Sequence, residues 1–351
     1  MKRKQKVWLI IILSILVLIG VSYLGISMYI DSMISKTIVE EVEPEDINIV
    51  EDITPKAHEV VNFMLVGADN LDRVNGRENS YAEERSDVFK IISLDYTDKK
   101  IKIISLDRDV VVWIPDKGSN GEFGRFNWAY SFGQAKYALG AINYNLDLDI
   151  AKYITFSFAG FRDVIDIIGG VDIELTTAEA NELNKSTNAT MYAQEGSNHL
   201  DGLTALNYAR IRKIDSDFVR MDRQNVVINA VINKFKNCSL NELLDVINKC
   251  LPYITTNLTG KEIKDYMLAI MSFDLNDLDQ QTYPIGEEYD VCWNKEGIGG
   301  YLVRSYSNQV KEIHKFIYGT DDYVPSQRIL DIEKKTYETY GDFYEGSELL
   351  P

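Results

Sequence analysis

An uncharged apolar segment near the N-terminus limits the topologies open to this chain. Residues 7–30 carry no charged side chain. A helix needs roughly 20 apolar residues to cross a bilayer core, so the segment is long enough. Four basic residues precede it, Lys2, Arg3, Lys4 and Lys6. Because basic flanks stay on the cytoplasmic side, we predict a cytoplasmic tail (residues 1–6), a single-pass transmembrane anchor (7–30) and an extracellular remainder.

A cleaved signal peptide and a buried core helix are the alternatives for this segment. A signal peptide has a shorter apolar run with a small-x-small cleavage site close behind it, and no clean site stands out near the small residues Ser22, Gly25 and Ser27. A core helix normally keeps a polar face, which this segment lacks. An uncleaved anchor in the cell membrane therefore fits the pattern best.

The chain behind the anchor divides into three parts. Residues 31–56 are acidic, contain Pro44 and Pro55 and show little periodicity, which predicts an extracellular stalk. Residues 57–320 interleave strand-like and helix-like segments and are predicted to form the main folded domain. The expected fold class is α/β, an α-β-α layered sandwich around a central mixed sheet. Residues 321–351 are predicted to be an acidic C-terminal tail.

The secondary structure is read from apolar periodicity and turn residues. Strands are predicted at residues 60–66, 87–94, 101–106, 153–158 and 171–175, with residues 95–100 as a hairpin turn. Residues 110–114 are predicted to continue the strand at 101–106 past a functional break. Residues 70–84 read as a polar loop. Helices are predicted at residues 130–145, 161–168 and 218–236. Capping boxes, a hydroxyl answered by a glutamate three residues later, predict further helix starts at Thr176, Ser239 and Thr259.

Charge and cysteine content exclude some classes of function. The net charge of −17 argues against a broad nucleic-acid-binding face, which would need a basic surface to displace counterions. The three cysteines allow one disulfide with one free thiol, or three free thiols: Cys238, Cys250 and Cys292. No cysteine or histidine pattern has the spacing of zinc ligands, so no zinc site is predicted.

Four arginines are concentrated in one short segment of this acidic chain, Arg210, Arg212, Arg220 and Arg223. A guanidinium group matches phosphate oxygens two at a time and stays charged at any relevant pH. If residues 208–212 are extended, Tyr208, Arg210 and Arg212 share one side, while Arg220 and Gln224 lie one turn apart on the following helix. The segment predicts a phosphate or diphosphate site. The alternative is a solvated salt-bridge lattice with Asp215, Asp217 and Asp222.

Two carboxylates and a further arginine extend this prediction. Asp69 follows an apolar strand at a glycine turn, and Asp87 begins the next strand. Two carboxylates combined with phosphate oxygens are a common way to hold Mg²⁺, whereas the alternative is a pair of ordinary surface-turn aspartates. Arg108 interrupts an otherwise apolar run, where a charge is costly unless it is paired or used.

Several motifs occur together in a recognisable order. They are residues 65–69 (LVGAD), 85–87 (RSD), 107–109 (DRD), 126–130 (FNWAY), 169–172 (GGVD) and 200–212 (LDGLTALNYARIR), followed by residues 215–224. With these motifs the chain resembles the LytR-CpsA-Psr family of membrane-anchored cell-wall enzymes. The resemblance is specific over the motif core, residues 60–236, and weaker to about residue 318.

The resemblance implies a function as well as a fold. Members bind a polyprenyl diphosphate-linked glycan in a cleft and transfer it to peptidoglycan, forming a phosphodiester bond at a muramic acid hydroxyl. Teichoic acids, capsules or related polymers are the expected cargo. The resemblance places Mg²⁺ on Asp69 and Asp87. It places the diphosphate contacts on Arg85, Arg108, Arg210, Arg212, Arg220 and Gln224. Of these residues, Arg108, Arg210, Arg212 and Arg220 are also expected to be catalytic. Such a transfer depends on positioning and charge stabilisation more than on a protein nucleophile.

The chain departs from the family pattern near the site. Asp107 stands in place of the usual proline, and Arg125-Phe126 in place of lysine-isoleucine. Asp109 and Asp217 are each candidates for a base or a brace. Two other functions use the same features: a hydrolase of the lipid diphosphate, and a non-catalytic envelope binding or regulatory protein of the kind named transcriptional attenuators.

Overall fold

The structure is a computed structural model that describes most of the chain behind the predicted anchor. The described residues are 38–39, 41–49, 57–68, 86–115, 117–118, 120–185, 191–236, 238–276, 278–293 and 299–345. The predicted anchor at residues 7–30, the predicted loop at 70–84, and the site residues Asp69 and Arg85 lie outside them. Among the helices in the described ranges, none combines the length and the apolar character needed to cross a membrane.

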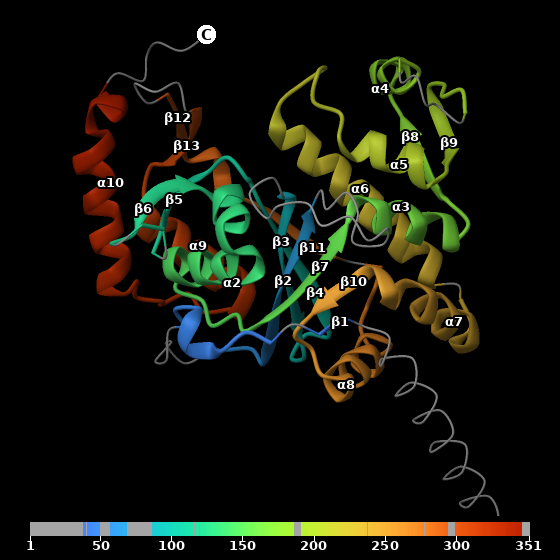
Figure 1. The fold of residues 1–351 in the computed structure, drawn as a ribbon, viewed down its shortest axis with the longest axis horizontal. Helices are drawn as coiled ribbons and strands as arrows, with labels where there is room; N and C mark the ends of the chain where they lie inside the picture. The colour runs from blue at the N-terminus through green and yellow to red at the C-terminus, as the bar shows by residue number, and fades with distance from the viewer. Residues whose placement is uncertain are drawn as a thin grey trace, which may run out of the picture.

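A seven-stranded mixed sheet forms the centre of the fold (Figure 1). From one edge to the other its strands are β1 (Ile38–Val39), β10 (Ile254–Thr256), β7 (Lys152–Ser157), β2 (Val60–Ala68), β3 (Ser86–Asp95), β4 (Lys100–Leu106) and β11 (Asp279–Tyr283). The central strand β2 pairs antiparallel with β3 and parallel with β7. The predicted strands 60–66, 87–94, 101–106 and 153–158 therefore form the middle of one sheet, and β3 and β4 are joined by the predicted turn.

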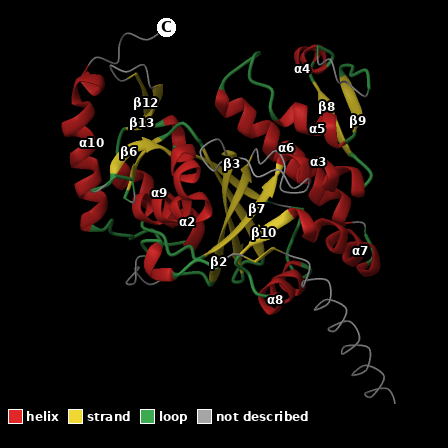
Figure 2. Ribbon diagram, in the orientation of Figure 1, coloured by secondary structure: helices red, strands yellow, loops and turns green. Residues whose placement is uncertain are grey.

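Helices cover both faces of the sheet, as Figure 2 shows. Side chains alternate along β2, so that Met64 and Val66 enter one core and Phe63 enters the other. The first core is closed by α2 (Phe126–Leu146), α9 (Tyr306–Tyr318) and α10 (Gln327–Glu345). The opposite face carries α3 (Phe158–Ile167), α5 (Gly202–Ala209), α6 (Asp217–Lys236), α7 (Leu240–Cys250) and α8 (Gly260–Ile270). The chain thus has the mixed α/β fold with a central mixed sheet that its sequence predicts.

Three small hairpins surround this framework. They are β5 (Val111–Ile114) with β6 (Glu122–Arg125), β8 (Val171–Leu175) with β9 (Gly196–Leu200), and β12 (Tyr289–Trp293) with β13 (Gly299–Val303). Residues 110–114 follow a break after β4, as predicted, but the prediction that they continue that strand is wrong, because β5 pairs with β6 outside the main sheet. Asp107 accepts the backbone N–H of Val110 on its carbonyl and that of Asp109 on its side chain, which closes a turn after β4.

The capping boxes predicted from the sequence are present. Thr176 caps α4 (Thr177–Leu183), Thr259 caps α8, and Ser239 with Glu242 makes the same reciprocal hydrogen bonds before α7. The three cysteines are free thiols, so the disulfide alternative is not realised. Short 3₁₀ helices complete the described elements at η1 (Pro44–Asp46), η4 (Leu251–Tyr253) and η5 (Ile285–Glu287).

Residues on both sides of the predicted 57–320 domain pack into it. β1 pairs with β10, and Ile47 is fully buried in the core beside α2, so part of the predicted stalk belongs to the fold. In the predicted tail, α10 places Ile329 and Ile332 in the same core. These isoleucines are three positions apart and share one helix face, while charged residues occupy the opposite face. The packed domain therefore includes α10.

Candidate functional site

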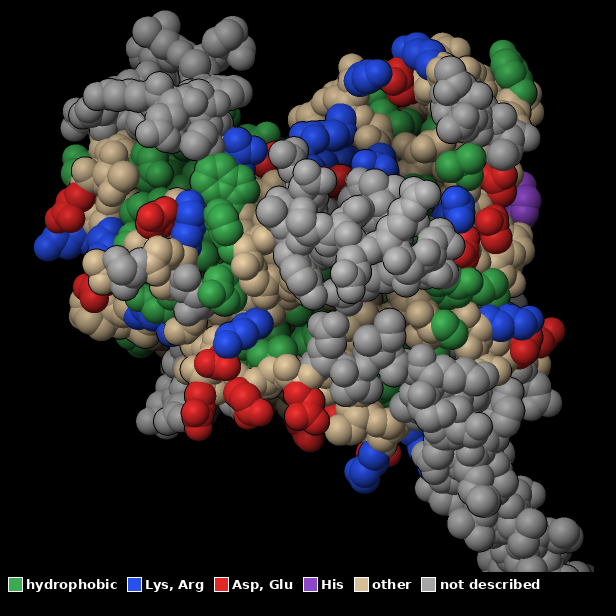
Figure 3. Space-filling model, viewed as in Figure 1, with side chains coloured by type: hydrophobic (Ala, Val, Ile, Leu, Met, Phe, Trp, Pro, Cys, Tyr) green, Lys and Arg blue, Asp and Glu red, His purple; other side chains and the backbone are tan. Residues whose placement is uncertain are grey.

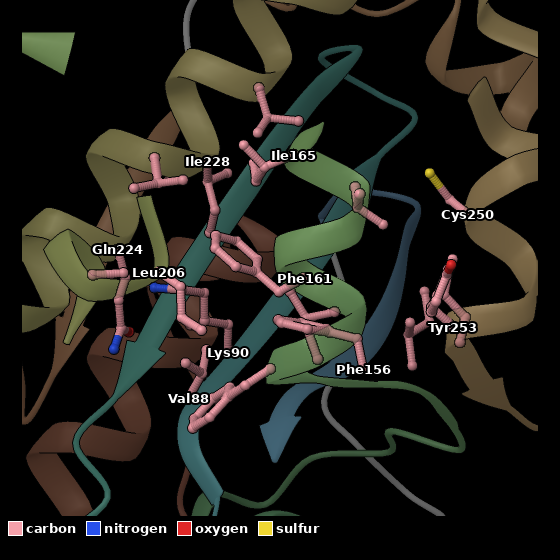
Figure 4. A pocket seen from close by; sticks show the side chains of 18 of the residues that line it. Val88, Lys90, Phe156, Phe161, Ile165, Leu206, Gln224, Ile228, Cys250 and Tyr253 are labelled. Carbon is pink, nitrogen blue, oxygen red and sulfur yellow. The ribbon is translucent and has the colours of Figure 1, made fainter. Parts of the chain in front are cut away.

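An apolar cavity separates the sheet from the helices of one face. Its volume is about 470 Å³, and its walls come from β2, β3, β7 and the helices α3, α5, α6 and α7. Figure 4 shows Phe161 and Ile165 from α3, Leu206 from α5 and Ile228 from α6 in the lining of this cavity. Apolar walls with a few polar groups are typical of small-molecule and lipid sites. The cavity is suited to an apolar chain.

Helix α6 carries the transition from apolar to basic lining. Val231 and Phe235 line the cavity toward the end of the helix, and Arg220 and Gln224 line it one turn apart near the start. Asp87, Arg210 and Arg212 line the same space. A ligand with an apolar chain and an anionic head therefore finds complementary groups in this order.

The placement of Arg210 depends on a close approach of two helices. A side-chain carbon at Gly202, the first residue of α5, would overlap the carbonyl oxygen of Arg162 in α3, so only glycine fits there. The N–H of Gly202 donates to Asp166 of α3 at 2.7 Å. Arg210 follows the end of α5 and stacks over Phe158 at the start of α3, 4.6 Å from the ring centroid.

Arg108 joins this group from the turn after β4. It donates to Asp87 and lies 3.5 Å from Asp109 and 3.9 Å from Asp217 through its Nε atom. Burial and the neighbouring Arg220 lower the pKa of Arg108 to about 10, which still leaves the group charged at neutral pH. An anionic ligand beside these two guanidiniums would relieve their mutual repulsion.

Carboxylate side chains form ion pairs that hold the arginines in position. Asp217 lies 3.0 Å from Arg212 Nε and 2.6 Å from Arg220 Nη2. Asp109 lies 2.9 Å from Arg125. The carboxylate oxygens of buried Asp107, Asp109 and Asp217 lie within 4.8 Å of one another, a spacing that a metal ion could bridge. Because Asp109 and Asp217 are already paired with arginines, we interpret the three as a brace for the basic groups.

Asp107 is the least solvated member of this trio. Burial and the neighbouring Asp217 raise its pKa to about 7. One side-chain oxygen accepts the N–H of Asp109, and the other has no hydrogen-bond partner. Below a pH of about 7 the carboxyl group of Asp107 therefore favours the protonated state.

The structure brings together six of the eight predicted site residues, namely Asp87, Arg108, Arg210, Arg212, Arg220 and Gln224. The other two, Asp69 and Arg85, lie outside the described residues. Figure 3 shows basic side chains gathered near the upper centre of this face, between the two halves of the molecule. The arginines thus share one space, whereas the roles assigned to them remain predictions.

One detail of the predicted arginine segment is wrong. Residues 208–212 are not extended: α5 ends at Ala209, Tyr208 is buried in the core beside α5, and Arg210 caps the helix. The salt-bridge alternative is realised in part: Asp217 pairs with Arg212 and Arg220, and Asp215 pairs with Arg223, the one of the four arginines that is not part of the cavity lining. Arg223 is buried, lies 2.7 Å from Glu179 and donates to Asp215, so it fastens α6 to α4.

One buried cation was not singled out by sequence. Lys90 of β3 is fully buried and donates to Ser105 at 2.6 Å and to Asn225 of α6 at 2.7 Å. Burial lowers its pKa to about 7. Its signal in the sequence is the same as that of Arg108, a charge within an apolar strand. Lys90 holds the middle of α6 against the sheet.

Comparison with known proteins identifies a family and relatives that this chain resembles. A family model described as the LytR_cpsA_psr family matches residues 22–312. The polyisoprenyl-teichoic acid–peptidoglycan teichoic acid transferase TagU of Bacillus mycoides (strain KBAB4) is 32% identical over 273 residues, which cover 76% of this chain and 83% of that protein.

Solved structures share the fold. B. subtilis TagV superposes with a TM-score of 0.60 at 25% identity, covering 76% of this chain and 99% of TagV. The LytR-CPS2A-psr family protein YwtF (TagT) with bound octaprenyl pyrophosphate lipid gives a TM-score of 0.57 at 21% identity, covering 78% of this chain and 96% of YwtF. At the latter identity the likeness is one of fold.

Proposed function

The chain belongs to the LytR_cpsA_psr family, and we propose that it transfers an anionic glycopolymer from a polyprenyl diphosphate carrier to peptidoglycan. The observation that carries this proposal is the junction of the apolar cavity with Arg210, Arg212 and Arg220. A prenyl chain matches the cavity, and a diphosphate matches the guanidiniums. TagU is named as a teichoic acid transferase, and YwtF was solved with a bound octaprenyl pyrophosphate lipid; both relatives support these assignments.

The residues present fit a divalent cation beside the diphosphate. Asp87 supplies carboxylate oxygens, the ligands that Mg²⁺ prefers, at the cavity lining. Ala68 pairs with Ser86 at the end of β2, and Asp69 is the next residue of the sequence after Ala68. We assign the two aspartates as the residues that would hold Mg²⁺, which would supply charge neutralisation to the diphosphate.

The protein side of the transfer is positioning. The acceptor hydroxyl oxygen bonds to the phosphorus that carries the glycan, and the bond from that phosphorus to the bridging oxygen breaks. The lipid monophosphate leaves, with its charge stabilised by Arg108, Arg210 and Arg220. The hydroxyl proton passes to a carboxylate. Asp109 is the better candidate, because its side chain is 15% exposed, whereas that of Asp217 is 6% exposed.

The predicted anchor at residues 7–30 determines where this reaction takes place. A polyprenyl carrier is confined to the membrane, and peptidoglycan lies outside it. A domain held on the extracellular side by a single N-terminal helix meets both substrates. We expect protease added to intact cells that lack their wall to digest the domain. Protection of the domain from the protease would overturn this placement.

A reconstituted reaction tests transfer against hydrolysis. The full chain in detergent is incubated with a lipid-linked anionic glycan, Mg²⁺ and peptidoglycan oligomers, and the products are separated by mass. We expect a covalent adduct of glycan phosphate on the oligomer. Release of free glycan phosphate with no adduct would identify a hydrolase instead, and donor binding without turnover would identify a binding protein.

A further inference from the structure

Three aromatic side chains form a cluster next to the arginines. Phe218 of α6 stacks on Tyr289 of β12, with ring centroids 5.0 Å apart and an angle of 16° between the rings. Tyr301 of β13 packs against Phe218 at 5.4 Å and against Tyr289 at 4.9 Å. All three side chains are partly exposed to solvent. We refer to Phe218, Tyr289 and Tyr301 as the aromatic cluster.

Helix α6 sets the order of cavity, arginines and aromatic cluster. Phe235 and Val231 line the apolar cavity, Arg220 lies at its basic end, and Phe218 lies two residues before Arg220 in the first turn. The rise of about 1.5 Å per residue separates Phe218 from Phe235 by about 25 Å along the helix axis. In Figure 1, α6 begins toward the β12–β13 hairpin and ends toward α7. The cluster therefore lies at the opposite end of the site from the cavity.

Both β13 and α6 connect the aromatic cluster to carboxylates of the site. Tyr301 donates its backbone N–H to the carbonyl of Asp109 at 3.0 Å, and Phe218 directly follows Asp217. Burial and the charges of Asp107 and Asp217 raise the pKa of Tyr301 to about 12, so its hydroxyl remains a neutral donor. Ring faces, a phenolic donor, carboxylates and guanidiniums thus meet in one place.

We propose that the aromatic cluster is the acceptor subsite, where a sugar ring of the peptidoglycan strand lies against the aromatic faces while its hydroxyl reaches the diphosphate. This inference rests on the proposed transfer function. Sugar rings present apolar C–H faces that pack on aromatic rings and hydroxyl groups that hydrogen-bond to carboxylates, and the cluster offers both.

The in-line geometry of the reaction indicates that the acceptor, and not the donor, binds at the aromatic cluster. In a phosphoryl transfer the attacking oxygen enters in line with the departing oxygen, on the opposite side of the phosphorus. The departing lipid phosphate is held by a chain in the apolar cavity. The acceptor must then enter from the far side of the arginines, and the aromatic cluster lies on that side.

Kinetics with separate donor and acceptor titrations test the subsite. Tyr289→Ala in the full chain is compared with the wild type, using a lipid-linked glycan and peptidoglycan oligomers. Loss of one aromatic platform is expected to raise KM for the oligomers about tenfold, with Kd for the donor and the rate of donor hydrolysis without oligomer changed less than about twofold. Tyr289→Phe keeps the ring and should restore KM. Tyr192→Ala, at an exposed tyrosine, is the matched control.

The other outcomes each overturn the assignment in a recognisable way. A weaker Kd for the donor with unchanged KM for the oligomers would assign the cluster to the donor sugar. A lower Tm with equal losses in every parameter would make the cluster a packing element. A wild-type enzyme that hydrolyses donor but forms no adduct would overturn the proposed function, and the acceptor subsite with it.

Discussion

Asp217 and Arg220, one turn apart at the start of α6, form an ion pair of 2.6 Å in which the side chains are only 6% and 2% exposed. The same carboxylate lies 3.0 Å from Arg212 Nε. A single buried aspartate therefore holds two guanidiniums, one from a loop and one from a helix, at fixed positions. Groups held in place before the ligand arrives lose less freedom on binding. This arrangement explains how an acidic protein keeps a dense basic site.

The first prediction concerns the two most exposed arginines of the site. Arg210 and Arg212 have side chains 44% and 47% exposed, so their removal should cost little stability. The double change Arg210→Ala and Arg212→Ala should weaken binding of a polyprenyl diphosphate about 100-fold or more, because each charged hydrogen bond contributes about 1.5–3 kcal/mol. Calorimetric titration and thermal unfolding measure the two effects.

Arg162→Ala is the matched control for this variant, since Arg162 of α3 is equally exposed and ion-paired but does not line the cavity. It should leave diphosphate affinity unchanged. A double variant that unfolds, rather than losing affinity, would show that Arg210 and Arg212 are structural.

The second prediction separates the metal from the arginines. Asp87→Asn keeps the shape of the side chain and removes its charge. Binding of a short prenyl diphosphate without Mg²⁺ should be unchanged or tighter, because a negative charge beside Arg108 is lost. The gain in affinity on adding Mg²⁺ should largely disappear. Calorimetric Mg²⁺ titration of the variant, with Asp163→Asn as control, measures this, and an unaltered Mg²⁺ response would refute the assignment of Asp87.

Local sequence patterns predict the middle of the fold but not its edges. Strands β2, β3 and β4 follow from apolar runs and from the polar turn at residues 95–100, since each needs only its neighbours along the chain. The partners of the outer strands, β1 with β10 and β4 with β11, are more than 170 residues apart in sequence. Nothing in the local pattern selects such pairs; burial of the two sheet faces does.

The site shows the same division between local and tertiary information. Residue type and charge balance single out Arg108 and the 210–220 arginines, because charge in the wrong surroundings is visible in a sequence. The conformation around Arg210 is misread because residues 208–212 also fit a strand, whereas Asp201 caps a helix by accepting the N–H of Thr204 at 2.8 Å. The pairing of Asp217 with Arg212 requires a folded loop, which spacing alone does not specify.

The third prediction probes the apolar cavity. Ile232 lines the cavity from α6, and Ile232→Trp fills part of its volume. Each CH₂ group of the lipid that no longer fits in the cavity loses about 0.8 kcal/mol of burial, so a long polyprenyl diphosphate should bind about tenfold or more weakly. Inorganic diphosphate should bind as before, because the arginines are unchanged. Val226→Trp on the exposed side of the same helix is the control. If both tryptophan variants bound the long lipid with equal affinity, the lipid would not occupy this cavity.

The last prediction uses Asp107, which stands where the family pattern has proline. Its folded-state pKa is raised from 3.8 to about 7 by burial and by Asp217. The folded protein therefore retains a proton that the unfolded chain releases, and the stability this contributes is complete below pH 3.8 and lost as the pH rises through 7. The substitution Asp107→Asn introduces an amide that cannot ionise, yet it keeps the oxygen that accepts the N–H of Asp109.

The free energy of unfolding of Asp107→Asn, relative to wild type, should therefore increase from pH 4 to pH 7.5, by at most about 4 kcal/mol. Denaturant unfolding at a series of pH values measures this difference. Asp331→Asn, at an exposed position on α10, should follow the wild-type curve throughout. Parallel curves for wild type and Asp107→Asn would mean that the buried carboxyl is ionised in the folded protein, with the arginines Arg108 and Arg220 supplying enough charge to hold it.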